Sequence, residues 1–244
     1  MTQIASPQNP RLKALRRLQG TRERARSGRF LAEGEDLIAT AESAGRPALE
    51  GFRVAGSGLG GERFHDVEPQ ALAAASTLGS STRVIGVYEQ CWSTPAGPLC
   101  VYLHGVGDPG NVGTILRSAQ AFGASSVALG RGCADPHSPK AVRASMGAIF
   151  GVAIARVDDV GELPGERIAL LADAAQILRR PKEKPAPSIT LLVGGERDGL
   201  PADVLAACER SARIPIETES LNAAMAATVA LYEMTREPSR VTAS

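Results

Sequence analysis

The sequence predicts an α/β protein in two parts, with a mainly parallel sheet in the second part. Six short apolar runs after residue 98 alternate with stretches of helical pattern. Repeated βα units of this kind favour a parallel sheet with helices on both faces. A shorter alternation of strands and helices fills residues 1–90. A chain of 244 residues with 43% hydrophobic side chains can bury the cores of both parts.

Residues 1–90 are expected to form a small α/β domain. Its first helix begins at Asn9 and Pro10, because an N-cap acceptor followed by proline is typical of a helix start. Leu12, Leu15 and Leu18 then share one face of that helix. The other elements expected here are helices at 35–43 and from 69 to about 78, and strands at 52–55 and 83–88.

Residues 91–98 are predicted to be a linker, since they contain Trp92, Pro95, Gly97 and Pro98. The second domain, residues 99–244, follows this linker. Its expected strands are 99–103, 125–129, 151–155, 167–171, 189–193 and 213–216, and its expected helices are 111–122, 138–147, 201–209 and 221–236. Residues 179–187 are charged and rich in proline, which indicates a loop.

Positive charge is concentrated near the N-terminus, although the net charge of the chain is only +1. Before residue 30 a single acidic residue, Glu23, accompanies the basic residues Arg11, Lys13, Arg16, Arg17, Arg22, Arg24, Arg26 and Arg29. This asymmetry fits an anion-binding face, and it fits a solvated helix surface equally well. If the face binds a nucleic acid, the candidate residues are Arg11, Arg16, Arg17 and Arg22.

The cysteines and histidines show no metal-binding pattern. Cys91, Cys100, Cys133 and Cys208 lie far apart without a C-x-x-C pair, and the three histidines are scattered. We therefore expect no metal, and free thiols in a reducing compartment. The N-terminus lacks the apolar stretch of a signal peptide, and no run approaches ~20 apolar residues. A cytoplasmic protein without a membrane partner is expected.

A glycine-rich stretch at 105–110 matches the dinucleotide-binding pattern G-x-G-x-x-G. It follows a predicted strand and precedes a predicted helix, as that pattern requires. However, Pro109 removes one backbone N–H donor from a phosphate cradle, and no acidic residue ends the next strand at 125–129. Arg131 offers a partner for a 2′-phosphate, so an NADP-dependent oxidoreductase remains an alternative.

Three segments together fit a different family. They are Asn111-Val112-Gly113 with Arg117, then Gly194-Gly195-Glu196 with Gly199-Leu200, then Ile214-Pro215-Ile216 with Ser220-Leu221-Asn222. In this order they resemble the motifs of the SpoU (TrmH) family of SPOUT RNA 2′-O-ribose methyltransferases. Residues 135–148 also resemble that family's segment after the second strand. The resemblance covers about residues 99–236.

The resemblance implies a C-terminal SPOUT domain with a deep trefoil knot from Val193 onward, although chains in general do not thread loops. It implies S-adenosyl-L-methionine as the cofactor, 2′-O-methylation of RNA, and a homodimer whose RNA site is built across both subunits. Phe30-Leu31-Ala32-Glu33-Gly34 resembles part of the ribosomal-protein-like RNA-binding domain that many members carry. This domain favours large-subunit ribosomal RNA over transfer RNA as the substrate.

The same resemblance assigns the candidate site. The implied catalytic residues are Arg117, Asn111, Glu196, Ser220 and Asn222, and the implied cofactor-binding residues are Gly194, Gly195, Ile214 and Leu221. Asn111 is also expected to cap its helix. Glu196 is expected to accept backbone hydrogen bonds or to pair with Arg117.

Arg117 matches the arginine that is thought to activate the 2′-hydroxyl in this family. A guanidinium group has a pKa above ~12 and makes a poor base, whereas it binds phosphate readily. We expect Arg117 to be essential and leave open whether it removes the proton. Gly195 stands where the family usually has Asn, and Arg197 where it usually has Gly. A non-catalytic RNA-binding module is a further alternative, which the complete set of site residues disfavours.

Overall fold

The computed structural model describes residues 3–181 and 188–236, which form two compact units. The first unit comprises Met1–Trp92, Asp108–Arg117 and Ala134–Gly151, and the second comprises Ser93–Gly107, Ser118–Cys133 and Val152–Ser244. The units therefore do not follow one another along the chain. Within the described part, none of the helices has the length and hydropathy of a membrane span.

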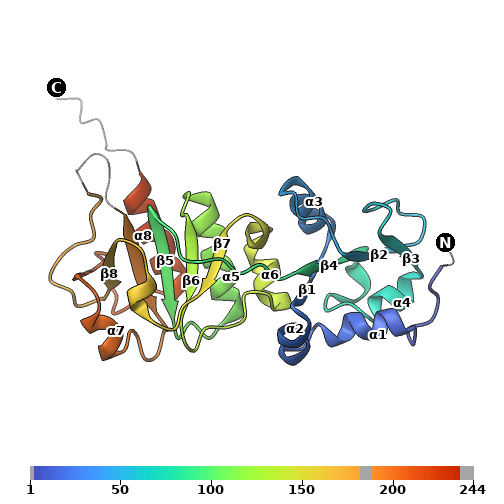
Figure 1. The fold of residues 1–244 in the computed structure, drawn as a ribbon, viewed down its shortest axis with the longest axis horizontal. Helices are drawn as coiled ribbons and strands as arrows, with labels where there is room; N and C mark the ends of the chain where they lie inside the picture. Colours follow the sequence, from blue (N-terminus) through green and yellow to red (C-terminus); the bar gives the residue numbers. More distant parts are fainter. Residues whose placement is uncertain (1–2, 182–187, 237–244) are drawn as a thin grey trace, which may run out of the picture. The chain divides into compact units, whose positions relative to one another are not determined.

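The first unit contains a four-stranded sheet in the order β1-β4-β2-β3 (Figure 1). Its strands are β1 (Arg29–Glu33), β2 (Glu50–Val54), β3 (Phe64–Val67) and β4 (Val84–Glu89). Strand β4 pairs antiparallel with β1 and β2, and β2 pairs parallel with β3. The helices are α1 (Pro10–Arg17), α2 (Thr21–Ser27), α3 (Glu35–Ser43), α4 (Pro69–Ala73), the first part of α5 (Pro109–Ala121) and α6 (Pro139–Ser145).

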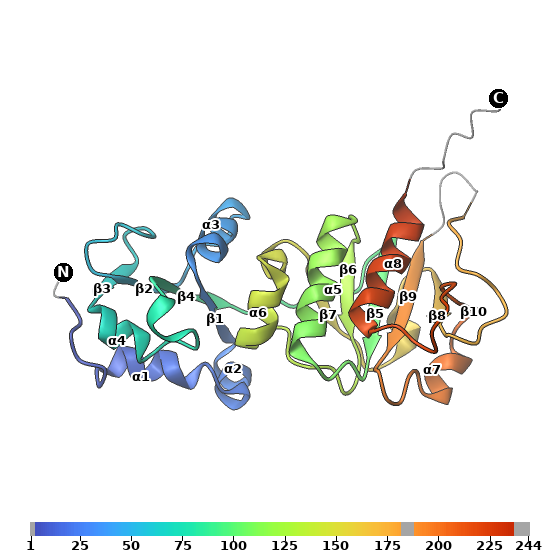
Figure 2. The same cartoon turned by 180° about the vertical axis from the view of Figure 1, so that it is seen from behind.

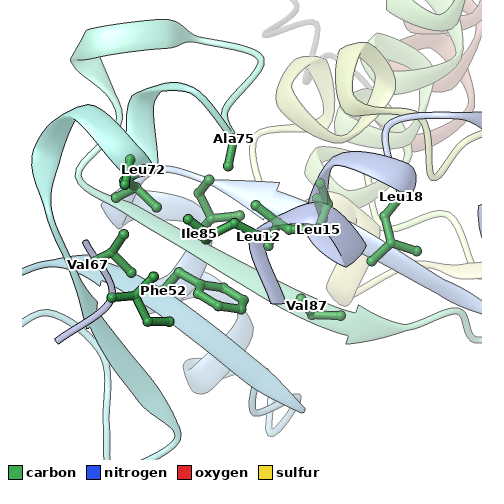
Figure 3. Close-up of a cluster of buried hydrophobic side chains, with 12 residues drawn as sticks. Leu12, Leu15, Leu18, Phe52, Val67, Leu72, Ala75, Ile85 and Val87 are labelled. Atoms are coloured by element: carbon green, nitrogen blue, oxygen red, sulfur yellow. The ribbon is translucent and has the colours of Figure 1, made fainter. Parts of the chain in front are cut away.

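The apolar face predicted for the first helix packs on this sheet. Asn9 accepts a hydrogen bond from the backbone N–H of Arg11 and so begins α1 as expected. Figure 3 shows Leu12, Leu15 and Leu18 gathered with side chains from the strands and α4. The buried partners include Phe52, Val67, Leu72, Ala75, Ile85 and Val87. Burial of this cluster stabilises the unit, because removing apolar area from water is favourable.

Among the helices and strands of the first unit, α2, β1 and β3 are not predicted from the sequence. Helix α2 has no apolar periodicity, because its buried side chain is that of Arg24. Strand β1 is buried continuously from Phe30 to Glu33, so it lacks the alternation that marks a half-exposed strand. The helix expected to reach residue 78 ends at Ala73, and Thr77 donates its hydroxyl hydrogen to the buried Glu33 carboxylate at 2.7 Å.

The second unit contains a six-stranded sheet in the order β10-β8-β9-β5-β6-β7. All of its strand pairs are parallel, as predicted. The strands are β5 (Leu99–His104), β6 (Ser126–Leu129), β7 (Ala153–Arg156), β8 (Glu166–Leu170), β9 (Ile189–Gly194) and β10 (Arg210–Ala212). Helix α7 (Ala202–Ala206) contributes Val204 to a core with Tyr102 and Leu192. Helix α8 (Ala223–Thr235) packs against β9 (Figure 2).

The strand predicted at 213–216 is wrong, because the last strand, β10, ends at Ala212. Pro215 has no N–H for a ladder hydrogen bond, so an apolar run that contains it is a poor central strand. The apolar side chains of Ile214 and Ile216 line a cavity instead. Residues 182–187 of the predicted loop 179–187 lie outside the described residues.

Candidate active site

A cavity of about 720 Å³ lies in the second unit, next to the ends of β8 and β9. Its walls come from the end of β8, from the turn between β9 and Leu200, and from the segment that leads from Ile214 into α8. Ligands in parallel α/β sheets bind outside the carboxyl ends of the strands, and this cavity occupies such a position. Its volume is within the range of small-molecule sites.

The turn after β9 depends on two glycines. A Cβ at Gly194 would lie 2.3 Å from the carbonyl carbon of Gly199, and one at Gly195 would lie 2.2 Å from the carbonyl oxygen of Gly105. Both distances are far below contact distance, so only glycine fits without moving backbone. Gly199 closes the turn with a positive φ of 63° and donates its N–H to the Gly195 carbonyl at 3.0 Å.

Asn222 joins this turn to the start of α8. Its Oδ1 accepts hydrogen bonds from the backbone N–H groups of Ala224 and Met225, which makes Asn222 the N-cap of the helix. Its Nδ2 donates to Glu196 Oε1 at 2.7 Å. Asn222 therefore holds an exposed carboxylate of the turn and caps the helix at the same time.

The cavity brings together the residues expected in the second and third motifs. Those that line it are Gly194, Gly195, Glu196, Ile214, Ser220, Leu221 and Asn222. Leu170, Leu171 and Ile216 add apolar wall, and Arg197 adds a cation. The two leucines are not among the predicted site residues, although their place at the end of a parallel strand is a signal for a ligand site.

The two residues of the first motif lie on α5, in the part of that helix that belongs to the first unit. The expectation that Asn111 caps this helix is wrong, since α5 begins at Pro109 and Asp108 Oδ1 accepts from the Asn111 N–H at 3.0 Å. Lys140 of α6 binds Asp108 at 2.7 Å, and this hydrogen bond lowers the pKa of the carboxyl. Arg117 is exposed, and it is the last residue of α5 that belongs to the first unit.

The candidate RNA-binding arginines fall into two groups in the first unit. Arg11 forms an ion pair with Glu50, and Arg16 donates to the Pro7 carbonyl at 2.7 Å. Arg17 and Arg22 are exposed and line a separate surface hollow of about 530 Å³. Arg26, which was not among the candidates, lines it as well.

Comparison with known proteins gives two family matches. The model of the SpoU rRNA Methylase family matches residues 98–232, and that of an MRM3-like substrate binding domain matches residues 9–59. The first match contains every residue assigned above to catalysis or to the cofactor, and the second contains the four candidate RNA-binding arginines.

Individual relatives match nearly the whole chain. An uncharacterized tRNA/rRNA methyltransferase of Synechocystis is 31% identical, with 96% of this chain and 93% of that protein covered. The 23S rRNA (guanosine(2553)-2′-O)-methyltransferase RlmP of Bacillus subtilis is 29% identical, with 96% and 99% covered. The AdoMet-bound rRNA methyltransferase structure from Sinorhizobium meliloti is 30% identical, has a TM-score of 0.83, and covers 95% of this chain and 96% of its own. With its parallel sheet, its glycine-dependent turn and a family match over more than half of its length, this chain belongs to the SpoU rRNA methylase family.

Proposed function

We propose that this protein transfers a methyl group from S-adenosyl-L-methionine to the 2′-hydroxyl of a ribose in ribosomal RNA. The observation that carries the proposal is the cavity beside the Gly194–Gly195 turn in a chain of the SpoU family. The bound cofactor in the Sinorhizobium relative and the 2′-O-methylation named for RlmP support the same assignment. Family membership favours it over the NADP-dependent oxidoreductase and over a binding module without catalysis.

The cavity fits S-adenosyl-L-methionine, which supplies an electrophilic methyl group when bound. Gly194 and Gly195 let the backbone of Gly199 and Gly105 pack directly against the turn that lines the cavity, where any Cβ would clash. The turn therefore lines the cavity with backbone, which suits a flat adenine. Leu221 and Ile214 offer apolar contacts, while Ser220 and Glu196 offer polar ones. Asn222 fixes Glu196 through its amide and so keeps the rim of the cavity in shape.

We assign Arg117 to a contact with the RNA substrate. Its guanidinium is exposed and presents a planar set of donors, so it suits a phosphate next to the target ribose. Asn111 lies in the first turn of the same helix, which Asp108 holds by accepting the Asn111 N–H. We assign these two residues to substrate positioning at the reacting ribose.

Large-subunit ribosomal RNA is the proposed substrate, because RlmP is named for 23S rRNA and residues 9–59 match a substrate binding domain. We propose that residues 1–90 bind RNA, that 91–98 link, and that residues 99–244 form the methyltransferase domain with the trefoil knot. The cytoplasm is the proposed location.

A homodimer is proposed from the exposed face of α8. Met225, Val229 and Tyr232 recur at helical spacing and are 63%, 41% and 54% exposed. Phe122 contacts the Tyr232 ring edge-on, with ring centroids 6.1 Å apart, and extends the apolar face. A second copy of this chain would bury that face in the homodimer that the family resemblance implies.

A methyl-transfer assay tests the activity. The purified protein is expected to move labelled methyl from S-adenosyl-L-methionine to unmodified ribosomal RNA, and ribose methylation is expected to block alkaline cleavage at one position. Calorimetric titration with the methyl donor and with NADPH separates the alternatives. Binding of NADPH alone, with no methyl transfer, would reject the proposal.

A further inference from the structure

Arg24 is the largest fully buried side chain of the described chain, and it organises the turn between α1 and α2. The residue is 2% exposed. Its Nη1 donates to the carbonyls of Leu18 and Gln19 at 3.0 and 2.6 Å, and its Nη2 donates to Thr21 Oγ1 at 3.1 Å. Since these acceptors belong to the turn itself, the guanidinium holds that turn in one conformation.

The turn presents an arginine-lined hollow to solvent. Arg17, Arg22 and Arg26 line it with Gly20 and Glu23, so three positive charges and one negative charge leave +2 there. Glu23 pairs with Arg26 at 2.6 Å. The other two arginines have no ion pair among those found in the described residues. A phosphate group of RNA matches this charge and the fork geometry of arginine.

The third nitrogen of the Arg24 guanidinium, Nε, contacts the other family segment. This nitrogen binds Asp135 Oδ2 at 2.8 Å, so the pair links the substrate-binding match at 9–59 to the methylase match at 98–232. The surrounding contacts are close. His137 lies 4.8 Å from Phe30 and 5.0 Å from Trp92 between ring centroids, and Arg143 Nη1 donates to Thr77 Oγ1 at 2.8 Å.

The segment that contains Asp135 also packs on the helix that contains Arg117. Lys140 binds Asp108 at 2.7 Å, and a Cβ at Gly113 would lie 2.3 Å from the Ala141 carbonyl oxygen. Helices α5 and α6 therefore touch through their backbones. All of these parts belong to the first compact unit, namely the turn, Arg24, Asp135, α6 and the first part of α5.

We propose that Arg24 and Asp135 are positioning residues, which hold an RNA-phosphate site at Arg17, Arg22 and Arg26 in fixed register with Arg117. This inference rests on the proposed RNA methylation and adds to it a second RNA contact and the connection that aligns the two. RNA bound at the hollow is thereby held with its target ribose at the catalytic arginine. Loss of the ion pair uncouples RNA binding from methyl transfer.

Two kinds of variant of the full-length protein separate the contact from the connection. Arg22→Ala removes a phosphate contact. It is expected to weaken binding of the ribosomal RNA substrate and to flatten the dependence of log affinity on log salt by about 0.7 to 0.9. At saturating RNA its kcat is expected to stay within about twofold of wild type. Asp135→Asn keeps the shape of the side chain and removes its charge. It is expected to leave the salt dependence unchanged and to lower kcat about tenfold or more.

Folding is followed in the same experiment, because Arg24 and Asp135 are both largely buried. S-adenosyl-L-methionine affinity and the thermal midpoint are measured for each variant. Arg143→Gln interrupts an exposed contact across the same packing and is expected to lower kcat in the same direction by a smaller factor, without a folding defect. Arg83→Gln, which breaks an exposed ion pair with Glu35, is the matched control and is expected to behave as wild type.

The outcomes are distinguishable from failure of the proposed function itself. If the wild-type protein methylates no RNA, the function fails. If it does, and Asp135→Asn and Arg143→Gln retain wild-type kcat, the positioning role is wrong. Unchanged RNA affinity and salt dependence in Arg22→Ala and in Arg17→Ala would remove the phosphate site.

Discussion

Asn222 donates its side-chain amide hydrogen to Glu196 at 2.7 Å while its carbonyl oxygen caps α8. One side chain thus serves both the turn after β9 and the helix that packs on that strand. The two roles use different atoms of the amide, so substitutions can separate them.

Asn222→Asp keeps an N-cap oxygen but replaces the donor to Glu196 with a second carboxylate. We expect stability close to that of the wild type and an S-adenosyl-L-methionine affinity at least tenfold weaker. Asn222→Ala loses the cap too, and is expected to cost a further ~1 kcal/mol of unfolding free energy. Calorimetry and urea denaturation measure the two effects. If Asn222→Asp binds S-adenosyl-L-methionine as tightly as the wild type does, the amide contact does not belong to the cofactor site.

Gly194→Val places side-chain atoms where the backbone of Gly199 lies, so it is expected to abolish detectable S-adenosyl-L-methionine binding. Isothermal titration calorimetry provides the measurement. Gly61→Ala is the control, because nothing lies within 4 Å of a Cβ at that position. A valine variant that binds the donor as wild type does would place the cofactor elsewhere.

Arg117→Ala is expected to bind S-adenosyl-L-methionine normally and to lose at least a hundredfold in methyl transfer, because its cation is assigned to RNA rather than to the donor. The rate of label incorporation into ribosomal RNA checks this. Gln120→Ala, an exposed change one turn further along α5, is expected to leave the rate unchanged. Methylation by Arg117→Ala at the wild-type rate would show that the helix contributes no essential arginine.

Asp135 should make the stability of the protein depend on pH. Burial raises its pKa, but hydrogen bonds from His137 and Arg24 outweigh burial and lower the pKa from 3.8 to about 2. A carboxyl whose pKa is lower in the folded state stabilises the fold above the pKa of the unfolded chain, here by about 2 kcal/mol. This contribution is lost as pH falls from about 4 toward 2.

Urea denaturation of wild type and Asp135→Asn at several pH values checks this prediction. The difference between their unfolding free energies is expected to be constant from pH 7 to about 5 and to shrink below about 4. A difference that stayed the same down to pH 3 would mean that the charge of Asp135 is not what stabilises the fold.

Val229→Glu is expected to convert the proposed dimer to a monomer, since it puts a charge into the centre of the exposed apolar face of α8. Light scattering coupled to size-exclusion chromatography gives the mass. Leu78→Glu changes a side chain of equal exposure, 41%, in the first unit and should not alter the mass. An unchanged mass for Val229→Glu would exclude α8 as the interface.

The parallel sheet was predictable because buried parallel strands are apolar runs, and β5, β6 and β9 fall within a residue or two of the expected ranges. The motif after β9 was predictable only through the resemblance to the SpoU family, and its two glycines fit the close backbone approach found in the structure. Arg24 was not predictable. Its sequence neighbourhood is mostly basic, and only the partner Asp135, more than a hundred residues later, distinguishes a buried arginine from a solvated one. The last strand was misplaced because Ile214 and Ile216 are apolar to line a cavity rather than to pair in a sheet.

The packing of residues 134–151 against the N-terminal part has a consequence for how genes of this kind can recombine. The ring centroid of Tyr88 lies 4.8 Å from that of Phe150 and 5.8 Å from that of Phe30. This aromatic group therefore combines side chains from both sides of the linker. A fusion that replaced everything before the linker would leave Phe150 and Asp135 facing foreign partners. The unit that can be inherited or transplanted intact is therefore discontinuous in the gene, and a working chimaera must exchange the 134–151 segment together with the N-terminal domain.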